Sequence, residues 1–73
     1  MVELNQYYKK KVEAQSFVRS AIQNSKKVEK SKLYLYVSEH YGFSELFVNK
    51  YLELLEQNGI VKLNKEMVVF VSG

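Results

Sequence analysis

The side chains that carry most enzymatic chemistry are scarce in this sequence. Its 73 residues include one histidine, no cysteine and no aspartate. His40 therefore has no second imidazole and no thiolate with which to form a zinc site. The serines have no base at the spacing of a hydrolase motif, and three glycines are too few for a phosphate-binding loop. We expect no catalytic residue, no metal and no cofactor, and we expect His40 to lie partly exposed near a helix C-terminus.

Lysine is the functional side chain that the sequence does concentrate in one segment. The net charge is only +3, but residues 9–32 hold eight lysines or arginines against two glutamates. Residues 33–59 reverse this balance, with four glutamates against Lys50. Clustered lysines are typical of surfaces that bind phosphates. For the run Lys9-Lys10-Lys11 two interpretations remain open, a solvated helix surface and a phosphate-contacting patch.

Residues 44–58 are predicted to form the helix around which the other elements are arranged. Ser44 is a good N-cap, and Glu45 suits the positive end of the helix dipole. Gly59 can adopt the left-handed conformation that ends a helix. The apolar residues at helical spacing, which predict its buried stripe, are Val48, Leu52 and Leu55.

The other elements follow from periodicity and turn residues. Residues 4–24 predict one long helix, or a short one with an N-terminal extension. The core stripe is Ala14, Val18, Ala21 and Ile22, and Leu4, Tyr8 and Val12 extend a stripe toward the N-terminus. Residues 26–31 fit either a short edge strand or a loop. Residues 32–41 have high β-propensity, but the helical spacing of Leu33, Val37 and Tyr41 favours a helix, with Ser31 as N-cap and Gly42 as a stop. Residues 60–63 and 67–71 predict a β-hairpin turning at 64–66.

This order of elements resembles the winged helix-turn-helix family. The resemblance covers roughly residues 14–71 and depends on V-S-E-H-Y-G-F-S-x-x-x-V-x-x-x-L-x-x-L-x-x-x-G-I-V from Val37 to Val61. It implies one winged-helix domain over residues 1–73, mainly α with a small β-hairpin. Three helices would carry a two- or three-stranded wing, with residues 1–13 as an N-terminal helical extension.

The resemblance also implies double-stranded DNA as the partner of a transcription regulator or genome-associated factor. Its third helix would enter the major groove with Glu45, Phe47, Asn49 and Lys50. Asn49 would pair with adenine, and Lys50 with guanine or a phosphate. The phosphate contacts of the wing and flank would come from Lys62, Lys65, Lys26, Lys27, Lys30 and Lys32.

The third helix also departs from a typical DNA reader. Leu46 and Phe47 stand where small polar residues usually face bases, and Phe47, Tyr51 and Leu54 form a second apolar stripe. Apolar residues in excess of those needed for the core indicate a surface that binds a partner. The alternative function is therefore a protein–protein interaction module. We expect Leu46, Phe47, Tyr7 and Tyr8 to line its interface, and we expect a homodimer using the first helix.

The composition also suggests a cellular context. The absence of cysteine fits a reducing cytoplasm, and the longest apolar run, Met67–Val71, is too short to span a bilayer. No signal-peptide pattern opens the sequence. The lysine-, tyrosine- and valine-rich composition resembles that of small proteins of thermophilic archaea or their viruses.

Overall fold

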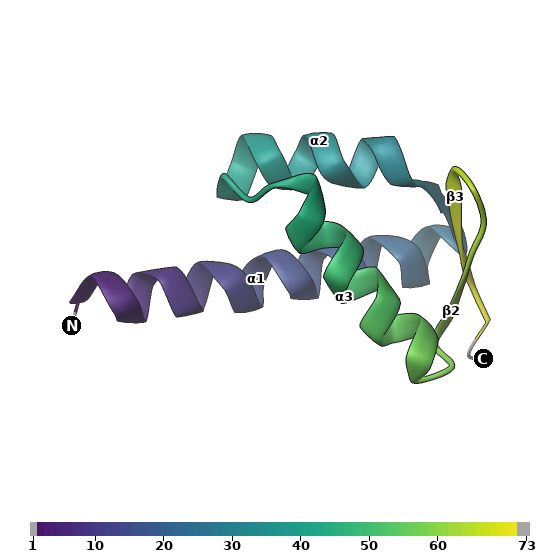
Figure 1. The fold of residues 1–73 in the computed structure, drawn as a ribbon, viewed down its shortest axis with the longest axis horizontal. Coiled ribbons are helices and arrows are strands. Elements are labelled where there is room, and N and C mark those ends of the chain that lie inside the picture. The colour runs from purple at the N-terminus through teal and green to yellow at the C-terminus, as the bar shows by residue number, and fades with distance from the viewer. Residues whose placement is uncertain (1, 72–73) are drawn as a thin grey trace.

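A computed structural model describes the backbone of residues 2–71 and the side chains of residues 6–71. It is mainly helical, with three helices and a small antiparallel sheet of three strands (Figure 1). The elements in chain order are α1 (Val2–Ser25), β1 (Lys27–Glu29), α2 (Lys30–Tyr41), α3 (Glu45–Gln57), β2 (Val61–Leu63) and β3 (Met67–Phe70).

The core lies where the three helices meet the inner face of the sheet. The predicted stripes of all three helices contribute to it, and Val61 and Val68 close it from the strands. No polar side chain among residues 6–71 is buried. The buried residues are Ala14, Val18 and Ile22 of α1, Leu33 and Val37 of α2, Val48, Leu52 and Leu55 of α3, and the two valines of the sheet.

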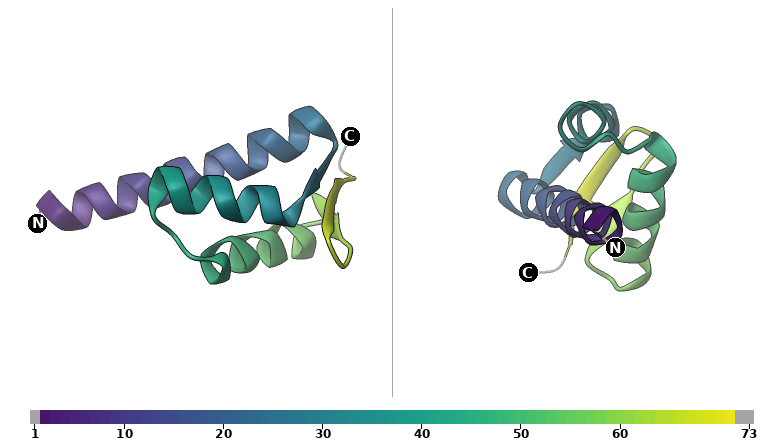
Figure 2. Two further views of the ribbon diagram at one scale, coloured as in Figure 1. Left: turned by 90° about the horizontal axis from the view of Figure 1, so that it is seen from above. Right: turned by 90° about the vertical axis from the view of Figure 1, so that its left-hand side faces the viewer.

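The N-terminal half of α1 projects beyond this core (Figures 1 and 2). Tyr8 and Val12 were predicted to extend the core stripe, but they are 67% and 44% exposed. That extension is wrong because the core residues of α1 begin at Ala14, and the Tyr8 and Val12 side chains lie on the exposed surface of the helix. The predicted contribution of the Leu4 side chain lies outside the described side chains.

The sheet has β3 at its centre, antiparallel to β1 on one side and to β2 on the other. Residues 26–31 therefore include an edge strand, one of the two predicted alternatives. Val68 pairs with Val28 and with Leu63 on the core face of the sheet. The free edge of β2 is partly satisfied by α3, since the Leu63 N–H donates to Glu56 Oε2 at 3.1 Å.

One predicted helix cap is at the wrong residue, and a second lacks the expected side-chain hydrogen bond. Ser31 lies inside α2, which begins at Lys30 with Glu29 as its N-cap residue. The reason is that β1 runs directly into the helix, where the Lys30 N–H donates to the Glu66 carbonyl of the hairpin at 2.9 Å. Ser44 is the N-cap residue of α3 as predicted, but its hydroxyl makes no capping hydrogen bond.

The turn between α2 and α3 depends on a left-handed residue. Gly42 has φ +74°, and its N–H donates to the Ser38 carbonyl at 3.1 Å. A Cβ at this position would meet nothing within 4 Å, so a side chain would be strained by its backbone angle and would not clash. The glycine therefore sets the entry of the chain into α3.

We expect Gly42→Ala to lower the free energy of unfolding by about 1–2 kcal/mol, the cost of a Cβ in the left-handed region. Gly42→Asn should lower it less, because asparagine tolerates this conformation. Urea denaturation followed by circular dichroism measures both. Equal losses for the two variants would show that the left-handed strain is not the cause.

Candidate nucleic-acid interface

Six lysines gather on and beside the sheet, at the end of the molecule away from the start of α1 (Figure 1). They come from three parts of the sequence: the junction of α1 with β1, the first turn of α2, and the β2–β3 hairpin. We call them the lysine cluster. Its members are Lys26, Lys27, Lys30, Lys32, Lys62 and Lys65.

The sheet fixes the spacing of two members of the cluster. Lys27 on β1 and Lys62 on β2 both pair with Val69 of the central strand. Val68 faces the core, so this row of three residues lies on the outer face, because side chains alternate along a strand. Both lysines are exposed. Two strand spacings separate their backbones, about 10 Å.

The hairpin tip is tied to the start of α2, which brings further lysines together. Lys30 Nζ donates to the Lys65 carbonyl at 3.5 Å, beside the backbone bond from Lys30 to Glu66. A hollow of about 170 Å³ at this junction is lined by charged residues of both signs, Lys30, Lys65, Glu29 and Glu66, together with Ser31 and Tyr34. The backbone thus holds the β2–β3 hairpin and the first turn of α2 side by side.

Most of the positive charge in the cluster has no carboxylate partner. Within residues 6–71 the one ion pair is Lys32–Glu29 at 3.5 Å, between two well-exposed side chains. The first turn of α2 contains Lys30 and Lys32 and no acidic residue, although the helix dipole makes this end positive. A bound anion would relieve this concentration of like charge.

Lys26 occupies an unusual backbone position. It has φ +67°, a left-handed conformation that glycine or asparagine adopts at lower cost. Its N–H donates to the Ile22 carbonyl at 2.8 Å, and its own carbonyl accepts from Phe70 N–H at 2.7 Å. The ammonium lies 4.9 Å from the centroid of the Phe70 ring, a cation–π contact. These contacts anchor the end of α1 to the last strand.

The α3 residues that were predicted to contact DNA bases differ in their exposure. Lys50 and Glu45 are exposed, but Asn49 is half-buried. The Tyr34 hydroxyl, on α2, donates a hydrogen bond to Asn49 Oδ1 at 2.6 Å. An asparagine that recognises adenine accepts with that same oxygen, so the acceptor of Asn49 is already engaged inside the protein.

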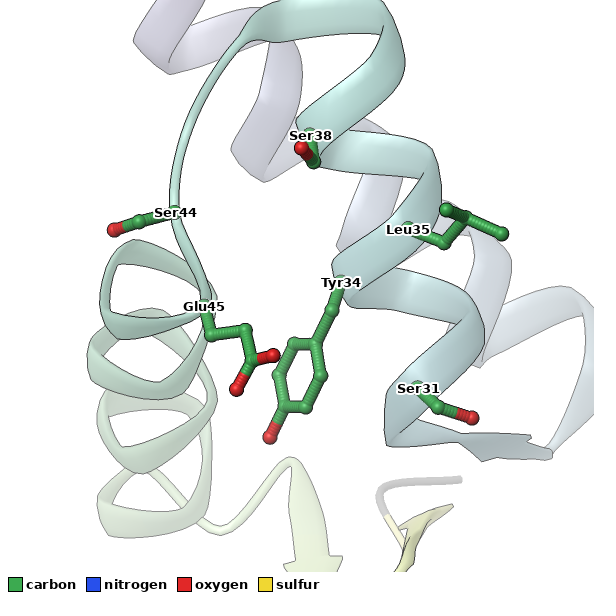
Figure 3. A pocket seen from close by; sticks show the side chains of 6 residues that line it. All are labelled: Ser31, Tyr34, Leu35, Ser38, Ser44 and Glu45. Atoms are coloured by element: carbon green, nitrogen blue, oxygen red, sulfur yellow. The ribbon is translucent and has the colours of Figure 1, made fainter.

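The groove between α2 and α3 is open but carries a negative charge. Figure 3 shows the Tyr34 ring and the Glu45 carboxylate pointing toward each other between the two helices, in a hollow of about 330 Å³. Ser44 points away from it. A phosphate would be repelled by Glu45 here. The lysine cluster is therefore the better phosphate surface.

We expect Tyr34→Phe to lower the free energy of unfolding by about 1 kcal/mol, because it removes a partly buried hydrogen bond that joins α2 to α3. Tyr36→Phe is the matched control on the same helix, since Tyr36 is 37% exposed and is held by ring stacking. Urea denaturation compares them. A control loss as large as that of Tyr34→Phe would contradict a specific role for this bond.

The residues predicted to line a partner interface fall into two groups. Tyr7 and Phe47 are joined by Phe43, which stacks on Phe47 at 4.2 Å and meets the edge of Tyr7 at 5.7 Å. They therefore connect the first half of α1 to the α2–α3 turn, although the Tyr7 side chain stays 54% exposed. Leu46 and Tyr8 are free, at 63% and 67% exposed.

The second apolar stripe of α3 borders a shallow groove against α1. Phe47 and Tyr51 are half-buried there, while Leu54 is 49% exposed. The groove has a volume of about 230 Å³, and Lys11 and Gln15 of α1 form its other side. Burial raises the pKa of the Tyr51 phenol against the opposing effect of Arg19, so this hydroxyl is neutral at physiological pH.

His40 is exposed at the end of α2, where it was expected. Its ring stacks on Tyr36 at 4.0 Å, and Tyr36 stacks on Phe17 of α1 at 3.9 Å. Within the described residues, no three histidine, cysteine, aspartate or glutamate side chains come together as a metal site. None of the helices in residues 2–71 combines the length and apolarity of a membrane span.

One surface was missed by the sequence reasoning. Met67 and Val69 lie half-buried on the outer face of β3, and Val71 beyond it is 53% exposed. The available signal was the lack of alternation in Met67–Val71, which is apolar on both faces of a strand. Lys27 and Lys62 flank Val69, and the exposed Glu29 pairs with Met67, so this sheet face combines apolar side chains with charges of both signs.

Comparison with known proteins gives no assignment. No protein-family model, no curated protein and no solved structure matches this chain. The function must therefore be argued from the residues and their geometry.

Proposed function

We propose that this chain is a small winged-helix protein that binds double-stranded DNA chiefly through phosphate contacts. The order of its elements and the position of β3 between β1 and β2 are compatible with that fold. The fold alone would not support a DNA-binding role, since one fold serves many functions. Support for DNA binding therefore comes from the side chains on the protein surface.

The lysine cluster is the observation that carries the proposal. Six cations from three parts of the sequence converge, and only Lys32 among them has a carboxylate within ion-pair distance. Lysines that neutralise phosphates release condensed counterions, and this release supplies most of non-specific DNA affinity. The cluster thus offers several phosphate contacts on one end of a small protein.

The chemistry of α3 favours weak sequence preference. Lys50 is its one cation, against Glu45, Glu53 and Glu56. The Asn49 acceptor is occupied by Tyr34, and Leu46 can offer a base only apolar contact. We therefore favour a genome-associated role over recognition of a single operator.

Fluorescence anisotropy with two duplexes of about 30 base pairs and unrelated sequence tests this proposal. We expect similar affinities for both, and log K should fall linearly with log salt at about −0.9 per phosphate contacted. Four or more contacts would give a slope near −4. Absence of binding at low salt would refute the proposal, and a strong preference for one duplex would refute its non-specific character.

Protein interaction is the second candidate function, because Leu46 and Leu54 are large apolar side chains exposed on one helix. Exposed apolar residues in such a group mark contact surfaces more often than isolated ones do. Failure to bind either duplex at low salt would leave this candidate in place.

A further inference from the structure

Within residues 2–71 no other helix or strand covers the outward side of α3 (Figures 1 and 2). It lies opposite the buried stripe of the same helix and consists of side chains at helical spacing. Lys50 and Leu54, at one edge of this side, also line the shallow groove against Lys11 and Gln15 of α1. Leu46 is 63% and Leu54 is 49% exposed, and Lys50 and Glu53 lie exposed between them along the helix. We call these four residues the α3 face.

The α3 face is complementary to itself. Its two leucines are eight residues apart, about 12 Å along the axis, and the opposite charges between them are one turn apart. A two-fold axis requires each patch to match its own rotated copy. A two-fold axis at residue 50 brings each leucine opposite the other leucine of the second copy, because positions 46 and 54 are equidistant from it. Lys50 then lies about one helical turn from Glu53 of the second copy, an offset that its long side chain can span.

We propose that α3 packs antiparallel against α3 of a second copy of this chain, forming a two-fold dimer. Leu46 would contact Leu54 of the partner subunit, and Lys50 would pair with Glu53 of the partner subunit. The axis that matches the leucines crosses the helix at residue 50. This interface goes beyond DNA binding and differs from the dimer through the first helix that the sequence suggested.

A second copy suits this face better than an unrelated partner. Lys50 and Glu53 of the two copies neutralise each other, and each leucine meets another leucine. Burying two leucines per chain also stabilises a fold whose own core is small. None of the lysines of the cluster belongs to α3, so a dimer would present two lysine clusters.

Charge reversal of the full chain tests the pairing. Sedimentation equilibrium of the natural chain, measured over protein concentrations that reach the millimolar range, should show a dimer. Lys50→Glu and Glu53→Lys should each weaken that dimer by at least about tenfold, because like charges then oppose each other. An equimolar mixture of the two variants should form a heterodimer, since one face is then doubly negative and the other doubly positive. The double variant Lys50→Glu/Glu53→Lys should also dimerise.

Leu46→Ser tests the apolar contact, with Leu35→Ser of the exposed α2 surface as its control. Only Leu46→Ser should weaken the dimer, by at least about tenfold, while circular dichroism shows both variants folded. A natural chain that stays monomeric would overturn the proposal. So would a dimer that tolerates Leu46→Ser, or single charge variants that are monomeric and fail to associate when mixed. DNA titration is a separate measurement, so failure of either proposal is recognised independently.

Discussion

Replacing Leu33 by alanine is expected to lower the free energy of unfolding by about 3 kcal/mol, within the usual 2–5 kcal/mol for a buried leucine. Leu33 is 2% exposed and contributes to the core between the helices and the sheet. A domain of this length has about 4–11 kcal/mol of stability in total. The substitution therefore removes a large share of it, and the midpoint of urea denaturation should fall sharply.

Leu35→Ala provides the matched control, because it makes the same chemical change two residues along α2. Leu35 is 60% exposed, so its truncation should change the free energy of unfolding by no more than about 0.5 kcal/mol. Both variants are compared at one protein concentration, since dimerisation would make stability depend on it. Similar losses at the two positions would mean that α2 packs with a different face.

Removing two charges from the lysine cluster should have the largest functional effect. Lys27→Gln/Lys62→Gln neutralises the two lysines that flank Val69 on the outer face of the sheet. We expect the DNA affinity to fall between about 10-fold and 100-fold near 0.1 M salt, and the magnitude of the salt slope to fall by about two. Anisotropy titration over a series of salt concentrations measures both quantities.

Lys9→Gln/Lys10→Gln changes the net charge by the same amount at the opposite end of the molecule. If those lysines form only a solvated helix surface, the salt slope should stay that of the natural chain. A loss equal to that of Lys27→Gln/Lys62→Gln would assign the affinity to overall charge, and the cluster would have no special role. The control also decides between the two interpretations of the lysine run.

The fold was largely predictable because its signals are local. The apolar spacing of Val48, Leu52 and Leu55 and the glycines at 42 and 59 define the helices and their ends within a few residues. The β-propensity of residues 32–41 was correctly outweighed by helical periodicity. The start of α2 was misplaced because a tertiary contact, from the Lys30 N–H to Glu66, replaces the expected serine cap.

The candidate site was harder to predict because it depends on contacts between distant residues. The lysines of the cluster were all named as phosphate contacts through the resemblance to winged helices, but their arrangement depends on strand register, which places Lys27 and Lys62 on either side of Val69. The Tyr34–Asn49 hydrogen bond joins residues fifteen apart and has no sequence signature. Leu46 and Phe47 were both expected at a partner interface, but only the structure separates them, since Leu46 is exposed and Phe47 stacks on Phe43.

The order of strands in the sheet has a consequence for how the protein is made. The central strand, β3, is the last described element, and it pairs Val69 with Lys27, which a ribosome adds forty-two residues earlier. The helices can form from local contacts while the chain is being synthesised, but neither edge strand has a neighbour until β3 has left the exit tunnel. During translation the lysines of β1 and β2 are thus present on the nascent chain before the sheet that spaces them exists.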